Sequence, residues 1–259
     1  MQERRMLELD LRRAVAEGGF ELHYQPIMRI DGPRIVGFEA LIRWPHPVRG
    51  LMSPSAFIPL AEDVGLIATL GEWVLRRACL DAAGWPEAVK VSVNLSPAQF
   101  RNAKLIDIVI AALRDARLPA KRLELEITET VLLSETEATL AILNHLHALG
   151  VQIAMDDFGT GYSSLSYFRN FRFDRIKIDS SFIRNISDDA SSLAVIRAVT
   201  GLSASLGMAI TAEGVETKEQ LEQLREEGCK EAQGFLFSPP VPADQVGRLL
   251  ADIGARSVT

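Results

Sequence analysis

Two adjacent aspartates, Asp156 and Asp157, follow the apolar run VQIAM and precede the segment FGTG. An apolar run of this length is typical of a buried strand, where ionised side chains are costly unless cations or hydrogen bonds meet them. Adjacent carboxylates suit a pair of metal ions, because one can bridge both ions while its neighbour holds only the second. The two aspartates are therefore candidate ligands for metal-dependent chemistry.

Further polar residues stand near the ends of predicted strands. Any one of them could face solvent, but seven consecutive predicted strands each carry at least one. Glu39 is the clearest case, since its apolar neighbours on both sides predict that it is buried. We therefore expect these side chains to meet in one pocket. Besides the two aspartates they are Glu39 in GFEALIR, Asn94 in VSVN, Glu126 in LELEIT, Lys177 and Asp179 in RIKID, Glu213 in ITAE and Gln233 in QGFLF.

The charge of this pocket requires cations. Its carboxylates would bring about five negative charges together, and Lys177 alone cannot balance them. Two divalent cations can do so, and a ligand set made of oxygen atoms favours Mg²⁺ or Mn²⁺ over zinc. A metal pair lowers the pKa of a shared water and clamps the oxygens of a phosphoester, so phosphoester hydrolysis is the predicted reaction. The predicted metal ligands are Glu39, Asn94, Glu126, Asp156, Asp157 and Glu213.

The elements that must position these residues alternate between strands and helices. After a charged amphipathic helix over residues 3–17, FELHYQPIMRI and RIVGFEALIRW are joined by Asp31-Gly32, which predicts an antiparallel hairpin. Strands and helices then alternate, which gives eight strands, seven of them alternating with helices. This α/β pattern indicates a (β/α)8 barrel with an antiparallel first strand, whose active site lies at the carboxyl ends of the strands.

Capping signals mark the ends of several predicted helices. Ser53 is a candidate N-cap, with Pro54 at the first helical position. Residues 96–99 (SPAQ) and 134–137 (SETE) have the spacing of capping boxes, and Gly150 is the expected C-terminal cap. The helix after the first box is expected to bury Leu105, Ile108, Val109, Ala112 and Leu113.

The composition excludes several classes of protein. The 259 residues are 47% hydrophobic and 24% charged, as in ordinary globular proteins, and a net charge of −6 argues against DNA binding through phosphates. The apolar stretches are strand-sized and the N-terminus lacks a signal-peptide core, so we expect a cytoplasmic chain without membrane contact. No linker-like stretch divides the sequence. We expect an N-terminal helix over residues 1–18 and one domain over residues 19–259.

The cysteines and histidines are not expected to bind metal. Cys79 and Cys229 are isolated in sequence, so buried free thiols are the interpretation. His145 and His147 stand two apart on a predicted helix and cannot share a face, and His46 lies in a proline-flanked loop.

A dinucleotide-binding loop is the main alternative for the segment after the paired aspartates. Gly159-Thr160-Gly161 follows a strand, and Asp179 stands 20 residues after Gly159, much as a dinucleotide fingerprint requires. However, Ser164 occupies the place of the third glycine, and the two aspartates would repel a pyrophosphate. A serine hydrolase is disfavoured because no G-x-S-x-G motif is present.

Glu39-Ala40-Leu41 followed by Arg43-Trp44 resembles the signature of EAL-domain cyclic di-GMP phosphodiesterases. The resemblance covers about residues 20–245 and includes, in the family's order, YQPI, FIPLAEDVGLI, VNLS, ELEITE, DDFGTGYSSL, KID, AEGVE and QGFLFSPP. It implies a TIM-like barrel with an antiparallel first strand. It also implies an enzyme with two Mg²⁺ or Mn²⁺ ions per active site that opens cyclic di-GMP to linear pGpG.

The resemblance assigns roles to individual residues. The family's metal ligands fall on the six positions already named, and its catalytic lysine falls on Lys177, which would act with Asp156, Asp157 and Glu213. This lysine would serve either as a base or as an electrostatic aid that orients the water. Glu129 matches the glutamate that braces the loop after the paired aspartates. The implied substrate contacts are Gln25, Leu41, Arg43, Asp179, Glu216 and Gln233.

Some details leave alternatives open. Pro239 stands where the family often has Arg or Lys, and Arg43 could instead form a salt bridge with a pocket carboxylate. The N-terminal segment resembles the connector to an upstream GGDEF or sensor domain, and the family implies a homodimer. The alternative function is a non-catalytic cyclic di-GMP receptor, although such relatives usually lose pocket residues and none is lost here. A hydrolase for another phosphoester and an interaction scaffold are the remaining hypotheses.

Overall fold

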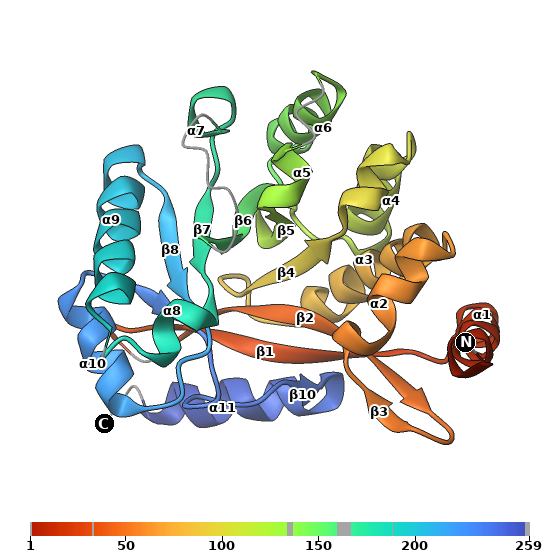
Figure 1. Ribbon diagram of the computed structural model, residues 1–259, viewed down its shortest axis with the longest axis horizontal. Coiled ribbons are helices and arrows are strands. Elements are labelled where there is room, and N and C mark those ends of the chain that lie inside the picture. The colour runs from red at the N-terminus through yellow and green to blue at the C-terminus, as the bar shows by residue number, and fades with distance from the viewer. Residues whose placement is uncertain (1, 33, 134–136, 160–166, 188, 257–259) are drawn as a thin grey trace.

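A closed barrel of strands with helices around it forms the molecule (Figure 1). The computed structural model describes residues 2–32, 34–133, 137–159, 167–187 and 189–256. The predicted α/β barrel is confirmed, because its strands hydrogen-bond in an unbroken ring. In ring order the strands are β1 (Glu21–Arg29), β2 (Ile35–His46), β4 (Lys90–Leu95), β5 (Leu123–Thr128), β6 (Gln152–Phe158), β7 (Arg175–Ile178), β8 (Ala209–Ala212) and β9 (Glu231–Ala232).

The first strand runs antiparallel to both of its neighbours, as the sequence predicts. Leu22 of β1 pairs with Ile42 of β2, and Met28 pairs with Ala232 of β9. The other neighbouring pairs of the ring are parallel. Two short strands, β3 (Gly50–Met52) and β10 (Val241–Pro242), add to β2 and β1 outside the ring.

Helices cover the outside of the barrel, and the core lies between the two layers. Outward residues of the strands, such as Leu125, Ile153 and Ile176, are fully buried there. The α-helices are α1 (Gln2–Glu17), α2 (Pro54–Asp63), α3 (Ile67–Ala83), α4 (Leu105–Ala116), α5 (Glu129–Leu133), α6 (Glu137–Ala148), α7 (Tyr167–Asn170), α8 (Ser180–Arg184), α9 (Ala190–Leu206), α10 (Lys218–Glu226) and α11 (Val246–Arg256). Short 3₁₀ helices are η1 (Pro97–Arg101), η2 (Ala120–Arg122) and η3 (Ala243–Gln245).

The predicted caps have mixed outcomes. Ser53 occupies the N-cap position of α2 but forms no side-chain capping bond. Ser96 and Gln99 do form a capping box, yet the box begins the short η1, and α4 starts only at Leu105. Gly150 has a φ of +90° just after α6, as expected of a C-terminal cap. The box over residues 134–137 begins outside the described residues.

The last predicted strand is shorter than expected. EAQGFLF reads as one strand, but β9 comprises only Glu231–Ala232. The chain turns after Gln233 because Gly234 packs directly on the backbone of Val215, where a Cβ would meet backbone nitrogen at 2.3 Å. Gln233 therefore follows the strand rather than beginning it, while its backbone nitrogen still donates to Ala212.

The cysteines and histidines have surroundings that suit structural roles. Cys79 and Cys229 are buried free thiols, as predicted. His46 is buried, and its Nδ1 accepts hydrogen bonds from the backbone of Val48 and Arg49.

None of the helices within the described ranges is long and apolar enough to cross a bilayer.

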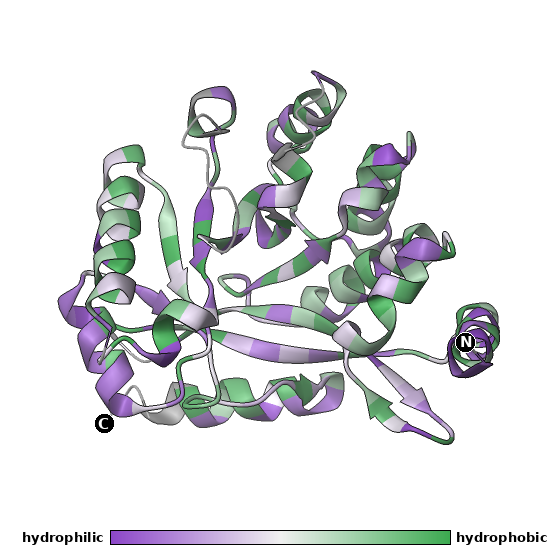
Figure 2. Ribbon diagram, in the orientation of Figure 1, coloured by the Kyte–Doolittle hydropathy of each residue, from purple (hydrophilic) through white to green (hydrophobic). Residues whose placement is uncertain are grey.

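The interior of the barrel contains a buried ionic layer below the predicted site. Side chains alternate along β7, so Arg175 and Lys177 face inward, and Figure 2 shows this strand with hydrophilic bands. Arg175 donates from Nε to both carboxylate oxygens of Glu124 at 2.9 Å and from Nη1 to Thr211 Oγ1 at 2.6 Å. Its Nη1 also contacts Glu231. This layer joins β5, β7, β8 and β9 at the floor of the site.

We expect Arg175→Met to lower the free energy of unfolding by about 3–5 kcal/mol, because it leaves two buried carboxylates without their cation. Urea denaturation followed by circular dichroism measures the change. Arg197→Met is the matched control, since Arg197 pairs with Glu227 at the surface and should cost about 1 kcal/mol or less. Equal stability of Arg175→Met and the unsubstituted chain would show that the layer contributes nothing.

Candidate active site

Lys177 stands among four of the predicted acids. Its Nζ lies 2.6 Å from Glu126 Oε2, 2.6 Å from Glu213 Oε1, 3.3 Å from Asp156 Oδ1 and 3.5 Å from Glu39 Oε2. The lysine side chain is 1% exposed. The acids come from β2, β5, β6 and the residue after β8, so the closed barrel is what brings them together.

Asp157 reaches the same pocket because β6 is irregular. Consecutive residues of a regular strand face opposite sides, which would point Asp157 away from Asp156. The register between β6 and β7 shifts between Met155 and Phe158, and Asp157 has a φ of +54° in the left-handed region. Carboxylate oxygens of Asp156, Asp157 and Glu213 consequently lie within 4.8 Å of one another.

Burial alters the protonation of these acids. It raises the pKa of Glu213 to about 8 and that of the half-buried Asp157 to about 6. Burial also raises the pKa of Glu126 well above its usual range. For Lys177 burial acts in the opposite direction, but the surrounding carboxylates outweigh it and hold the pKa of this lysine well above its usual value. The pocket therefore holds more acid than one lysine can keep ionised.

The donor atoms of the pocket fit a divalent cation. The three clustered carboxylates offer only oxygen, the ligand that Mg²⁺ and Mn²⁺ prefer. Glu126 Oε1 is buried and accepts no hydrogen bond from the described residues. A buried carboxylate oxygen without a partner is costly, so a ligand that meets it would stabilise the site.

A chain of hydrogen bonds holds Glu39 in place. Asn94 Nδ2 donates to Glu39 Oε1 at 2.7 Å, and Gln233 Nε2 donates to Glu39 Oε2 at 2.6 Å. Gln233 Nε2 also donates to Gln25 Oε1 at 3.0 Å, and Gln25 Nε2 donates to the carbonyl of Ser238 at 3.3 Å. These bonds, with Lys177, lower the pKa of Glu39 although burial raises it. The segment around Ser238, which precedes Pro239, is thereby connected to a predicted metal ligand.

A cavity of about 290 Å³, here called the mouth cavity, opens over the acids. Within the described residues it is lined by more acidic than basic side chains. The predicted site residues on its wall are Gln25, Glu39, Leu41, Asp156, Glu213, Glu216 and Gln233.

Two predicted substrate contacts lie off this wall. Arg43 donates from Nη1 to the carbonyl of Ile42 at 3.0 Å, and no ion pair joins it to a described carboxylate. The alternative of a salt bridge to a pocket acid is therefore not seen. Asp179 caps α8 by accepting from the backbone nitrogen of Ser181 at 3.0 Å, and its charge contributes to the raised pKa of Asp157 after burial and Asp156.

Glu129 contacts Gly159, two residues after the paired aspartates. Its Oε1 accepts a hydrogen bond from the backbone nitrogen of Gly159 at 3.1 Å. Gly159 has a φ of +95°, and a Cβ there would meet the ring of Phe182 at 2.9 Å, so only glycine fits. Of the dinucleotide-loop alternative, Thr160, Gly161 and Ser164 lie outside the described residues.

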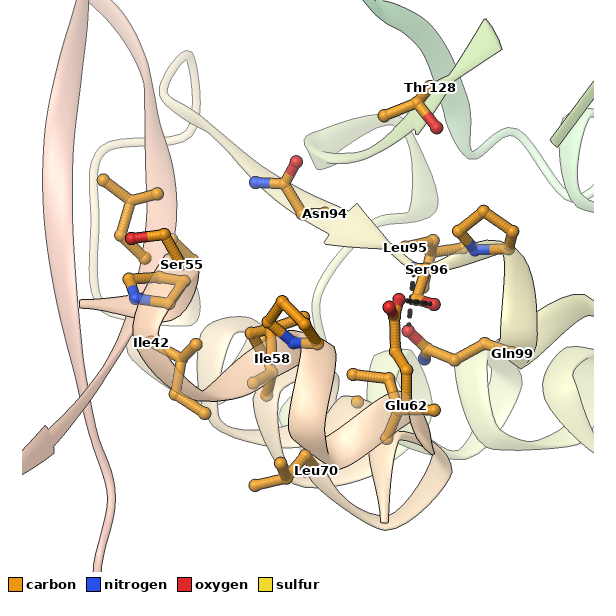
Figure 3. A pocket seen from close by; sticks show the side chains of 18 residues that line it. Ile42, Ser55, Ile58, Glu62, Leu70, Asn94, Leu95, Ser96, Gln99 and Thr128 are labelled. Carbon is orange, nitrogen blue, oxygen red and sulfur yellow. Dashed lines mark hydrogen bonds between the residues drawn. The ribbon is translucent and has the colours of Figure 1, made fainter. Parts of the chain in front are cut away.

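An apolar cleft of about 420 Å³ adjoins the mouth cavity and shares Leu41 with it. Figure 3 shows Ile42, Ile58 and Leu70 in this cleft. At its polar end Ser96 Oγ donates to Glu62 Oε1 at 2.5 Å. Asn94 also lines the cleft, and its side chain donates to Glu39, which lines the mouth cavity.

Sequence reasoning missed six residues that line the mouth cavity: Ser180, Arg184, Gly214, Gln220, Gly234 and Phe235. Gln220 could have been found from the capping-box spacing of TKEQ, because its Oε1 accepts from the backbone nitrogens of Glu216 and Thr217. Phe235 is 64% exposed, which its apolar context did not predict. No local pattern distinguishes Ser180 or Arg184.

Comparisons with known proteins find relatives that are similar in sequence and fold. The protein y4lL of Sinorhizobium fredii is 51% identical over 250 residues, which are 96% of this chain and 30% of that protein. MucR of Pseudomonas aeruginosa, a bifunctional diguanylate cyclase/cyclic di-GMP phosphodiesterase, is 44% identical over 250 residues, 95% of this chain and 36% of MucR. The solved PaMucR phosphodiesterase in complex with c-di-GMP has a TM-score of 0.89 at 43% identity, covering 93% of this chain and 99% of that one.

The chain thus spans about a third of the length of these curated relatives. The family model described as EAL domain matches residues 8–240. Because that match covers most of the sequence, the chain belongs to the EAL domain family.

Proposed function

We propose that this chain is a metal-dependent phosphodiesterase that hydrolyses cyclic di-GMP to linear pGpG. The observation that carries the proposal is the pocket of acids around Lys177, with Asp156, Asp157 and Glu213 within 4.8 Å of one another. MucR, which is 44% identical, is named as a bifunctional diguanylate cyclase/cyclic di-GMP phosphodiesterase, and the solved PaMucR phosphodiesterase shares the fold of this chain. A pocket of this charge would be costly to keep without a cation to neutralise it.

The proposed ligands of two Mg²⁺ or Mn²⁺ ions are Glu39, Asn94, Glu126, Asp156, Asp157 and Glu213. The pair of ions would lower the pKa of a water and neutralise charge on the phosphodiester. The protein positions the proposed ligands. Asn94 and Gln233 hold Glu39 by hydrogen bonds, and the left-handed backbone at Asp157 places its carboxylate beside Asp156.

For Lys177 we propose an electrostatic role among the catalytic residues. Its Nζ contacts four carboxylates at once, so it holds their oxygens at a common point and limits their repulsion. Asp156, Asp157 and Glu213 complete the catalytic set because they form the tightest cluster beside it.

The shape of the site suits a dinucleotide. The mouth cavity of about 290 Å³ and the apolar cleft of about 420 Å³ meet at Leu41, so a ligand can centre its phosphate over the acids and extend a base into the cleft. The exposed ring of Phe235, which also lines the mouth cavity, offers a stacking surface for a base. The proposed substrate contacts are Gln25, Leu41, Arg43, Asp179, Glu216 and Gln233.

Turnover of cyclic di-GMP with Mg²⁺ or Mn²⁺, followed by chromatography, tests the proposal. We expect pGpG as the product, and no activity after chelation with EDTA. Binding of cyclic di-GMP without turnover in either metal would instead support a receptor, and faster hydrolysis of a different phosphoester would support another hydrolase.

Three further assignments remain predictions. We propose that residues 1–18 form a connector to an upstream GGDEF or sensor domain and that residues 19–259 form the phosphodiesterase domain. We also propose a homodimer, from the family resemblance, and a cytoplasmic location, from the strand-sized apolar stretches and the absence of a signal-peptide core in this sequence. Size-exclusion chromatography with light scattering tests the dimer.

Asp156→Asn should reduce turnover by at least about three orders of magnitude, because an amide cannot supply the bridging negative charge. Steady-state rates with saturating Mn²⁺ measure this loss, and calorimetry should show weaker Mn²⁺ binding. Asp244→Asn is the control, because Asp244 is exposed and away from the mouth cavity. A rate for Asp156→Asn within about tenfold of the unsubstituted chain contradicts the assignment.

Glu129→Ala should raise the Mn²⁺ concentration needed for half-maximal activity by about 10- to 100-fold, because the bond to Gly159 supports the segment after the aspartates. Titration of activity with Mn²⁺ measures the effect. Glu137→Ala, in the exposed first turn of α6, serves as the control. If the two variants require the same Mn²⁺ concentration, Glu129 does not support the metal site.

A further inference from the structure

The wall of the mouth cavity is strongly acidic. Glu39, Asp156, Glu213 and Glu216 line it, and among the described residues Arg184 is the only cation on that wall. Lys177 does not line this wall. Its side chain is 1% exposed, and its ammonium group is already paired with the carboxylates that surround it.

Arg184 has no partner for its charge among the residues that the structure describes. It is the last residue of α8, and its side chain is exposed. No ion pair or hydrogen bond joins its guanidinium to any residue in the described ranges. Some described arginines, such as Arg197 with Glu227 and Arg225 with Glu222, are ion-paired, whereas Arg184 combines an unpaired guanidinium with a place on the cavity wall. A planar guanidinium that faces a ligand cavity unpaired is suited to a bidentate contact with a phosphate.

A cyclic dinucleotide offers a group for such a contact. Both phosphodiesters belong to one small ring, so when the first lies over the clustered carboxylates the second cannot leave the mouth cavity. The bases, in contrast, can extend beyond it. The second phosphate would then lie against the acidic wall, where Arg184 is the only cation among the described lining residues.

We propose that Arg184 binds the phosphodiester of the cyclic dinucleotide that is not being cleaved. This assignment rests on the proposed function and adds a substrate-binding residue to it. Arg184 neutralises the second phosphate and sets the position of the ring, whereas bond cleavage depends on the acid pocket.

Arg184→Gln tests the assignment. We expect the KM for cyclic di-GMP to rise about tenfold while kcat changes by less than about twofold, since one charged hydrogen-bonding contact is lost outside the reacting centre. Hydrolysis of bis(4-nitrophenyl) phosphate, which has a single phosphate, should be unchanged. Arg184→Lys should recover part of the affinity, because it retains the charge but not the planar fork.

Two controls separate this contact from other effects. Arg5→Gln, on α1, removes the same charge from an exposed position away from the cavity and should leave KM unchanged. Cyclic di-AMP has the same phosphates with different bases, so its binding measured by calorimetry should weaken as much as that of cyclic di-GMP in Arg184→Gln. A loss confined to cyclic di-GMP would show a contact with guanine and overturn the proposal.

The remaining outcomes are also decisive. An unchanged KM for cyclic di-GMP in Arg184→Gln would contradict the proposal. An equal loss of activity toward bis(4-nitrophenyl) phosphate would contradict it as well. If the unsubstituted chain binds cyclic di-GMP but does not cleave it, the proposed hydrolysis fails, whereas the dissociation constants of the variants still test Arg184. If it does not bind cyclic di-GMP at all, both proposals fail together.

Discussion

The site depends on an imbalance of charge around a single buried cation. Lys177 contacts four carboxylates, whereas Arg175, two residues earlier on β7, contacts two. The layer of Arg175 is satisfied by protein groups, with Thr211 completing its hydrogen bonds. The layer of Lys177 is not fully satisfied by protein groups, because Glu126 Oε1 is buried and has no hydrogen-bond partner among the described residues. One strand thus carries a closed ionic layer that supports the barrel and an open layer that can accept a ligand.

Local backbone geometry decides which acids join the open layer. A regular β6 would send Asp157 to the opposite face, and the left-handed φ of +54° turns it back. Gly159 continues the turn where no side chain fits, and Glu129 holds its nitrogen. On the far side of the pocket, Gly234 packs on the backbone of Val215 and so allows Gln233 to reach Glu39. The barrel brings the strands together, and these irregular backbone positions turn the side chains toward the pocket.

The sequence predicted the barrel because alternating strand and helix patterns are local signals, and it predicted the acid pocket because buried charges near strand ends need a common partner. Other features depended on contacts distant in sequence. The end of β9 is set by Val215, 19 residues from Gly234, so EAQGFLF alone could not reveal it. Within the described part of the chain no ion pair or hydrogen bond joins the guanidinium of Arg184, and no residue spacing encodes this. Arg43 was expected in the site from resemblance alone, and its observed bond is to its neighbour Ile42.

Acidic, apolar and basic residues occupy different parts of the site, so they can orient a bound ligand. The acids occupy the centre, the apolar cleft extends past Leu41 on one side, and Arg184 with the exposed Phe235 lies on the wall of the mouth cavity. Apolar surface favours a base and repels a phosphate, while a guanidinium favours a phosphate, so the two sides are not interchangeable for an asymmetric ligand. A symmetric cyclic dinucleotide offers the same groups in either orientation. Such a ligand can therefore satisfy an asymmetric site whichever of its phosphates reaches the acids first.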